Sequence, residues 1–165
     1  MTIRRARGAD RDVLAALAFR SKAHWGYDDA FMERSRGVLT PTQEYLANDP
    51  VYVAENDAGA IVGFYGFVRE GRELWLNDLW VEPAAIGTGA GRALFAHAVA
   101  TARAAGDAAF FIESDPNAEG FYLAMGAART GERVAAVTGR VLPVLRYELR
   151  ARKIPEASSS PRPTS

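Results

Sequence analysis

The sequence predicts an α+β (mixed α/β) fold in which helices flank a central, mostly antiparallel mixed sheet. Two observations carry this prediction. Three strand-like segments follow one another between residues 51 and 81, and a strand, a glycine-rich turn, a helix and a further strand fill residues 72–113. With 165 residues and no cysteine, the chain is expected to form one domain over residues 1–150 around a self-sufficient core. Residues 151–165, rich in Ser, Pro and charge, are expected to be a disordered tail.

The N-terminal part is expected to hold one strand and then helices. A strand at 2–7 precedes a helix at about 9–23, for which Asp10 is the expected N-cap. Apolar residues recur at helical spacing at Val13, Leu14, Leu17 and Ala18. Residues 21–49 break this pattern around Trp25-Gly26-Tyr27, and Thr40-Pro41 opens a last short helix ending near Ala47. We expect this segment to be irregular, helical and rich in aromatic residues.

A meander of three antiparallel strands is expected next, at 51–55, 61–69 and 72–81, with short polar turns between them. The apolar alternation changes phase within the third strand, between Leu76 and Leu79. This slip at Asn77-Asp78 is typical of a β-bulge, although a strand buried on both faces would show the same pattern.

The C-terminal half alternates between the two element types. A helix with one apolar face begins near Gly91 and ends at Gly106, and a buried strand follows at 108–113. A short helix at 118–125 is ended by Gly126. The chain is expected to close with a pair of strands at 133–138 and 145–149.

Composition excludes several classes of function. The 20 Lys and Arg residues balance 20 Asp and Glu residues, which argues against nucleic acid as a partner because phosphate-backbone binding needs a basic surface. The absence of Cys and the presence of only two His argue against a metal site and exclude a Cys nucleophile. No apolar run approaches the roughly 20 residues of a membrane span and the start lacks a signal peptide, so we expect a cytoplasmic protein without a membrane partner.

The most informative motif is the glycine-rich turn at Gly87, Gly89 and Gly91, between a strand and a helix. Such glycines let backbone N–H groups approach an anion, and the helix N-terminus adds attraction, which predicts a phosphate-bearing ligand. No Lys-Ser or Lys-Thr pair closes the run as in nucleotide hydrolases, and the last glycine of a dinucleotide fingerprint would fall on Arg92. A purely structural connection would show the same glycines.

The residues around this turn resemble a known family. Val-x-Pro at 81–83, the Gly-x-Gly-x-Gly run and Arg92-Ala93-Leu94 resemble the acetyl-CoA-binding core of the GNAT superfamily of N-acetyltransferases. The stretch 115–127 resembles a second GNAT motif through Ala118, Phe121, Tyr122, Met125 and Gly126. The order of elements over residues 2–150 is also similar. The resemblance implies a GNAT-like acyl-CoA N-acyltransferase fold, acetyl-CoA as co-substrate and a small-molecule primary amine as acceptor, with homodimers as a common assembly.

The resemblance also implies a set of cofactor contacts. Backbone amides of residues 86–91 would hold the pyrophosphate of CoA, and the main chain of 79–81 would run beside the pantetheine arm. The implied cofactor-binding residues are Leu79, Trp80, Val81, Ile86, Gly87, Thr88, Gly89, Ala90, Gly91, Arg92, Asn117, Phe121 and Tyr122. Two positions depart from the family: Ile86 replaces a common Arg or Gln, and Asp115 stands where Asn often contacts the cofactor.

The implied chemistry is direct attack of the amine in a ternary complex, since no Cys can carry the acyl group. Tyr122 lies where the family places the general acid for the departing thiolate; a phenol pKa of about 10 lies near the thiol value of about 8.5. A buried core tyrosine is the alternative. Trp75 and Asn77 occupy positions often used for the base. Glu113 is therefore the first candidate base, ahead of Asp78 and His24. A water relay, or a substrate amine that is already partly neutral, is the alternative to a dedicated base.

The acceptor pocket is implied to involve the aromatic segment and the proposed bulge. The expected substrate-binding residues are His24, Trp25, Tyr27, Asn77 and Asp78. For Trp25 and Phe31, packing of the helices on the sheet is the favoured role. The loop 140–143 is expected at the same pocket or at a dimer contact. A GNAT-like module that binds acyl-CoA without turnover is the alternative function, favoured by Ile86 and by the missing base on the third strand.

Overall fold

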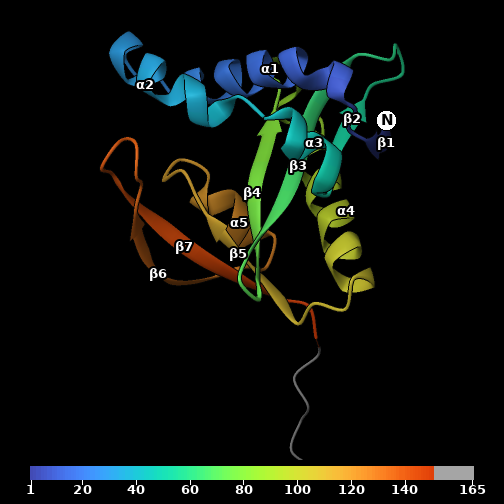
Figure 1. Cartoon of the computed structure of the whole chain (residues 1–165), viewed down its shortest axis with the longest axis vertical. Helices are drawn as coiled ribbons and strands as arrows, with labels where there is room; N and C mark the ends of the chain where they lie inside the picture. The colour runs from blue at the N-terminus through green and yellow to red at the C-terminus, as the bar shows by residue number, and fades with distance from the viewer. Residues whose placement is uncertain (151–165) are drawn as a thin grey trace, which may run out of the picture.

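A seven-stranded sheet forms the centre of the computed structural model, which describes residues 1–150 (Figure 1). The strands are β1 (Thr2–Arg5), β2 (Val51–Glu55), β3 (Ile61–Glu70), β4 (Glu73–Val81), β5 (Ala109–Glu113), β6 (Ala128–Val134) and β7 (Val141–Glu148). Their order is β1-β2-β3-β4-β5-β7-β6, and only the β4–β5 pair is parallel. The predicted mixed, mostly antiparallel sheet is confirmed, while the predicted tail at 151–165 lies outside the described residues.

Helices cover both faces of this sheet. The helices are α1 (Arg11–Ala23), α2 (Asp29–Leu39), α3 (Gln43–Asn48), α4 (Ala90–Ala104) and α5 (Glu119–Ala124). The first three pack with Val51, Val53 and Phe64 in one core cluster. The last two pack on the residues of opposite phase in the same strands, such as Tyr65, in a second cluster. Figure 1 shows α1 and α2 lying across one end of β4, with α4 running beside β3.

The expected β-bulge is present in β4. Gly66 pairs with Asp78, and the next residue, Phe67, pairs with Leu76, so Asn77 is the extra residue. Because the residues before and after a bulge change face, the phase slip in the sequence reflects this irregularity. The bulge places Asn77 and Asp78 at the middle of the molecule, where β4 leaves its neighbour β5.

The parallel strands β4 and β5 are joined over a very short distance. Only two residue pairs connect them, Trp75 with Phe111 and Leu76 with Ile112. Beyond these pairs the strands diverge, as Figure 1 shows. Within the described chain, the edge of β4 from residue 77 to 81 therefore has no neighbouring strand on the β5 side. This gap between two strands of one sheet creates space for a ligand in the centre of the fold.

The N-terminal helical region differs in detail from the expectations. Val13 is 48% exposed, since α1 turns Leu14 and Leu17 inward instead. Asp10 stands at the N-cap position of α1, but it is the last residue of a 3-10 turn, has a helical conformation and makes no capping hydrogen bond to α1. Its carboxylate instead accepts hydrogen bonds of 2.9 and 3.1 Å from the Arg4 guanidinium.

The segment expected to be irregular contains two regular helices. The Asp28 side chain caps α2 by accepting from the Phe31 amide at 2.7 Å. The Thr42 side chain caps α3 by accepting from the Tyr45 amide at 3.0 Å. These side chains satisfy amides that a helix start leaves without partners, which explains why both helices begin cleanly.

The closing strands are placed differently from the prediction. The chain forms β6 at Ala128–Val134 and β7 at Val141–Glu148, where strands were expected at 133–138 and 145–149. All residues of β6 but one are exposed, so this edge strand carries no hydrophobic alternation in its sequence. Residues 135–140 form the connecting turn instead, closed by a 2.8 Å bond from the Gly139 amide to the Ala135 carbonyl.

Gly66 is a position where any side chain should destabilise the fold. A Cβ there would overlap the Tyr45 hydroxyl, which donates a 2.8 Å hydrogen bond to Asp78. We expect Gly66→Ala to lower the free energy of unfolding by about 1–3 kcal/mol, the usual cost of overpacking. Urea unfolding measures this change. The control is Gly131→Ala in β6, where a Cβ meets nothing within 4 Å; equal losses in both variants would contradict the expectation.

Candidate active site

A cavity of about 500 Å³ lies at the opening between β4 and β5. It is bounded by the bulge and the end of β4, the glycine-rich turn, the end of β5 and α5. Its lining residues are Ser21, Trp25, Leu76, Asn77, Leu79, Trp80, Val81, Ala85, Ile86, Gly87, Gly89, Gly91, Arg92, Glu113, Asp115, Asn117, Ala118, Phe121 and Tyr122. The volume suits an organic ligand, and most of the wall is apolar.

One end of the cavity is built by the glycine-rich turn. Gly87 and Gly89 have φ of +81° and +90°, a left-handed conformation that disfavours residues with a side chain. Gly89 is also the N-cap of α4, so the amides of the first turn of this 15-residue helix have no helical partners. A Cβ at Gly87 or Gly89 would meet no protein atom within 4 Å, which leaves the turn open to a ligand. This end of the cavity suits an anion.

Tyr122 lines the cavity as a buried tyrosine. The residue is only 6% exposed and packs against the rings of Phe95 and Phe121 at centroid distances of 6.1 and 5.3 Å. Burial, followed by the negative charges of Asp78 and Asp115, raises the pKa of the Tyr122 hydroxyl well above its ordinary value. The hydroxyl is therefore protonated over the working pH range and can act as a proton donor.

Behind the bulge, the buried carboxylate of Asp78 accepts three hydrogen bonds. They come from the Tyr45 hydroxyl at 2.8 Å, the Asn77 amide at 2.9 Å and the Trp80 indole at 2.9 Å. Burial raises the pKa of Asp78, and the three donors oppose this effect. Since the Asn77 Nδ2 group faces Asp78, the carbonyl oxygen of this cavity-lining amide is turned away from the carboxylate.

Of the two acidic residues that line the cavity, Glu113 stands at the end of β5. Its carboxylate lies 3.4 Å from Nε of Arg133, whose guanidinium stacks 4.4 Å above the Trp75 ring. The Glu113 side chain is 34% exposed. It thus combines access to the cavity with an ion pair to Arg133.

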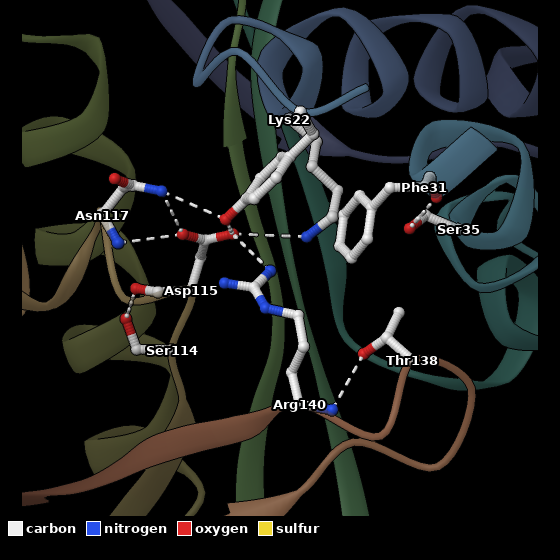
Figure 2. Close-up of polar contacts among 9 residues, drawn as sticks. Lys22, Phe31, Ser35, Ser114, Asp115, Asn117, Thr138 and Arg140 are labelled. Carbon is white, nitrogen blue, oxygen red and sulfur yellow. Dashed lines mark hydrogen bonds and ion pairs between the residues drawn. The ribbon is translucent and has the colours of Figure 1, made fainter. Parts of the chain in front are cut away.

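The second acidic residue, Asp115, is the centre of a group formed with Lys22, Tyr27, Asn117 and Arg140, here called the Asp115 cluster (Figure 2). The Asp115 carboxylate accepts from the Tyr27 hydroxyl at 2.7 Å and lies 3.3 Å from the Lys22 ammonium. Burial alone would raise the pKa of Asp115, but the hydrogen bonds from Tyr27 and Asn117 and the charge of Lys22 outweigh it and lower that pKa.

The Asp115 cluster joins four separate segments of the chain. Lys22 belongs to α1, and Tyr27 lies between α1 and α2. Asp115 and Asn117 lie between β5 and α5, and Arg140 lies between β6 and β7. Figure 2 shows Lys22, Asn117 and Arg140 converging on the Asp115 carboxylate. The cluster therefore fixes the relative positions of the elements that enclose one side of the cavity.

Comparison with known proteins decides the family. Residues 47–126 match the family model described as an acetyltransferase (GNAT) domain. The matched span contains β4, the glycine-rich turn, β5 and α5, which supply most of the residues that line the cavity. Residues 47–126 form a GNAT domain. A search of the curated proteins finds no match to its sequence.

Solved GNAT structures share the fold at low sequence identity. A GCN5-related N-acetyltransferase from Rhodopseudomonas palustris has a TM-score of 0.75 and 19% identity, covering 90% of this chain and 95% of its own. The PaiA N-acetyltransferase of Thermoplasma acidophilum, solved with coenzyme A, has a TM-score of 0.71 and 14% identity over 89% and 98% of the two chains. YncA of Salmonella typhimurium, solved with acetyl-CoA, has a TM-score of 0.66 and 24% identity, covering 95% of this chain and 98% of its own.

The structure brings together most of the residues that the sequence singled out in this GNAT protein. The implied site residues that line the cavity are Trp25, Asn77, Leu79, Trp80, Val81, Ile86, Gly87, Gly89, Gly91, Arg92, Glu113, Asn117, Phe121 and Tyr122. Others lie outside its wall: His24 is exposed with its ring against Trp25, Tyr27 joins the Asp115 cluster, and Asp78 is buried behind Asn77. Thr88 in the turn and Ala90, the first residue of α4, do not line the cavity.

The two aromatic residues expected to pack differ from each other. Phe31 is buried among the helices, whereas Trp25 is 44% exposed and lines the cavity. Sequence reasoning missed Ser21, Leu76, Ala85 and Ala118 as lining residues, and it noted Asp115 only as a departure from the family. It also missed Lys22, whose partner Asp115 is 93 residues away in the sequence. No local pattern marks such a contact.

Two further classes of site were sought in the described part of the chain. Over residues 1–150, no group of His, Asp and Glu side chains is arranged to hold a metal ion. In the same residues, no helix has the length and apolar character needed to cross a membrane.

Proposed function

We propose that this GNAT protein transfers the acetyl group of acetyl-CoA to a primary amine of a small molecule, by direct attack within a ternary complex. One observation carries the proposal: a single cavity joins an anion-binding turn, the unpaired edge of β4 and a buried, protonated phenol. Acetyl-CoA would supply an activated acyl group as a thioester. The remaining tasks fall to residues of the protein.

The residues present fit such a co-substrate. The open left-handed glycines and the free amides of the first turn of α4 would hold the pyrophosphate. Arg92, exposed in the first turn of α4, would add positive charge. The unpaired edge of β4 offers main-chain groups to the amide-containing pantetheine arm, as a neighbouring strand would. Backbone contacts can therefore replace the side-chain donor that Ile86 lacks.

Tyr122 and Glu113 would carry out the two proton transfers of the reaction. A phenol that stays protonated can donate to the sulfur as the thiolate leaves. Glu113 is an accessible carboxylate at the cavity wall and would accept the proton from the amine, directly or through water. Asp78 fits this role poorly because it is buried behind Asn77 and holds three hydrogen bonds already.

The proposal is tested by calorimetric titration with acetyl-CoA and CoA, followed by a thiol-release assay over a panel of primary amines. Binding of acetyl-CoA with amine-dependent thiol release supports the enzyme. Binding without release from any amine would favour the alternative from the sequence, a module that binds acyl-CoA without turnover. Failure of both compounds to bind would overturn the proposal.

Asn77 is expected to position the acceptor amine. Asn77 lines the cavity and its amide nitrogen is held by Asp78, so the amide oxygen is the group available to accept a hydrogen bond from the amine. We expect Asn77→Ala to lower kcat/KM for the amine by about tenfold, the effect of one hydrogen bond worth about 1.4 kcal/mol. Steady-state kinetics with both substrates measure it. The KM for acetyl-CoA should stay unchanged, whereas the melting temperature should fall because the buried Asp78 loses one of its three donors. A parallel rise in the KM for acetyl-CoA would contradict this role.

A further inference from the structure

The Asp115 cluster contains more positive than negative charge. Lys22 and Arg140 both approach the one carboxylate of Asp115, at 3.3 and 4.0 Å. Both cations also lie over the same two rings: Lys22 is 5.2 Å from the ring centre of Tyr27 and 5.5 Å from that of Phe31, and Arg140 is 4.8 and 5.2 Å from them. Two cations against one carboxylate leave a net charge of one positive unit in a largely buried place.

In this cluster the acceptor oxygens of Asp115 are more fully hydrogen-bonded than the donors of Arg140. Both oxygens of Asp115 are engaged: Oδ1 by the backbone and side-chain nitrogens of Asn117, and Oδ2 by Tyr27 and Lys22. The Arg140 guanidinium is 4.0 Å from Asp115, beyond hydrogen-bond distance, although it carries five N–H donors. The acceptors of the cluster are therefore saturated, whereas Arg140, whose guanidinium also approaches the Tyr27 hydroxyl, keeps most of its five donors free. The cluster suits an added anion and not an added cation.

These cations stand next to the cavity. Asp115, Asn117 and Trp80 line it, and the Lys22 ammonium is 5.9 Å from the Trp80 ring centre. Arg140 approaches the same carboxylate from the β6–β7 connection, as Figure 2 shows. Its side chain is 28% exposed, against 14% for Lys22, so Arg140 is the more accessible of the two donors. Arg140 therefore approaches a carboxylate that is itself part of the cavity wall.

We propose that the acceptor carries a carboxylate next to its amine, as an amino acid does, and that Arg140 with Lys22 binds this carboxylate. The inference rests on the proposed acetyl transfer, because it assigns the acceptor of that reaction. A guanidinium matches a carboxylate through two parallel hydrogen bonds, and the rings of Tyr27 and Phe31 hold the Arg140 plane in place. A second carboxylate would also balance the charge of the cluster, whereas an acceptor with a second ammonium would face repulsion.

Binding of reaction products provides a test that does not need turnover. The CoA-saturated protein is titrated calorimetrically with the N-acetyl-L-amino acids and, for each, the matching carboxamide, which differs only in the charge. We expect at least one acid to bind about tenfold or more tightly than its amide. Equal affinities throughout the panel, tighter binding of the amides, or no binding of any acid would overturn the proposal.

Two substitutions locate the effect. Arg140→Gln should bring the ratio of acid to amide affinity close to one. Arg36→Gln, which removes a cation from an exposed ion pair with Glu33 on α2, should leave the ratio unchanged. A ratio that survives in Arg140→Gln would also overturn the proposal. The affinity ratio of Lys22→Gln is interpreted only if the melting temperature of this variant matches that of the wild type, because Lys22 is more deeply buried than Arg140.

The failure of acetyl transfer would look different. If acids bind selectively through Arg140 but no amino acid releases thiol from acetyl-CoA, the proposed enzyme activity fails and the carboxylate subsite stands. If thiol release occurs only with amines that lack a carboxylate, acetyl transfer stands and the subsite is wrong.

Discussion

Gly89→Glu is expected to lower the affinity for CoA and acetyl-CoA by at least about 100-fold. Gly89 has φ of +90° at the N-cap of α4, a conformation that costs a residue with a side chain roughly 1–2 kcal/mol. The new carboxylate would also stand where the free amides of α4 attract an anion, and would repel a pyrophosphate there. Calorimetric titration with CoA measures the loss.

Two further variants separate charge from strain. Gly89→Ala introduces the strained backbone without the charge, so its affinity should lie between that of the wild type and Gly89→Glu. Gly106→Glu is the control for folding: Gly106 ends the same helix with φ of +85° and has equally open space around its Cβ position. It should bind CoA normally. Unchanged affinity in a folded Gly89→Glu would remove the glycine-rich turn from the cofactor site.

Tyr122→Phe is expected to lower kcat by about 100-fold or more, the usual contribution of a positioned general acid. Phe fills the same volume among Phe95 and Phe121, so only the proton donor is lost. Affinity for CoA should stay the same. Since burial and nearby carboxylates raise the pKa of Tyr122, its ionisation should not lower the wild-type rate below about pH 10. Steady-state rates across the pH range measure both effects.

Tyr147→Phe is the matched control for this loss. Tyr147 packs against Phe95 and Phe110 in the same core but does not line the cavity. Its loss of a hydroxyl should leave kcat unchanged. A Tyr122→Phe enzyme with wild-type kcat would show that Tyr122 is a packing residue, the alternative that the sequence left open.

The parts of the fold that sequence analysis predicted are those with local signals. The meander over β2 to β4 has polar turns and alternating apolar residues. The glycine-rich turn is recognisable because glycine recurs at every second position. Even the bulge at Asn77 left a trace, because an extra residue shifts the phase of the apolar positions. The edge strand β6 left none: it is almost wholly exposed, so no alternation marks its start at Ala128.

The candidate site also contains parts with a local sequence signal and parts without one. The turn and α5 are contiguous stretches whose residues line the cavity, and these were identified from their order along the chain. The Asp115 cluster depends instead on contacts between residues 88 and 93 positions apart, formed only when helices and sheet pack together. Asp78 shows a third case. Its three partners include Tyr45 on α3, so its burial follows from packing that a strand pattern does not contain.

The short junction between β4 and β5 affects how the molecule holds together. Strands β1 to β4 form one block and β5 to β7 another, and in the sheet only the pairs Trp75–Phe111 and Leu76–Ile112 join them. In the free protein, the two blocks should separate transiently most easily at this junction. Helix α4 spans both blocks on one side of the sheet. A pantetheine arm lying along β4 would take the place of the missing strand, so the co-substrate would complete the sheet. The same gap would then determine both where the co-substrate binds and how cooperatively the two blocks of strands fold.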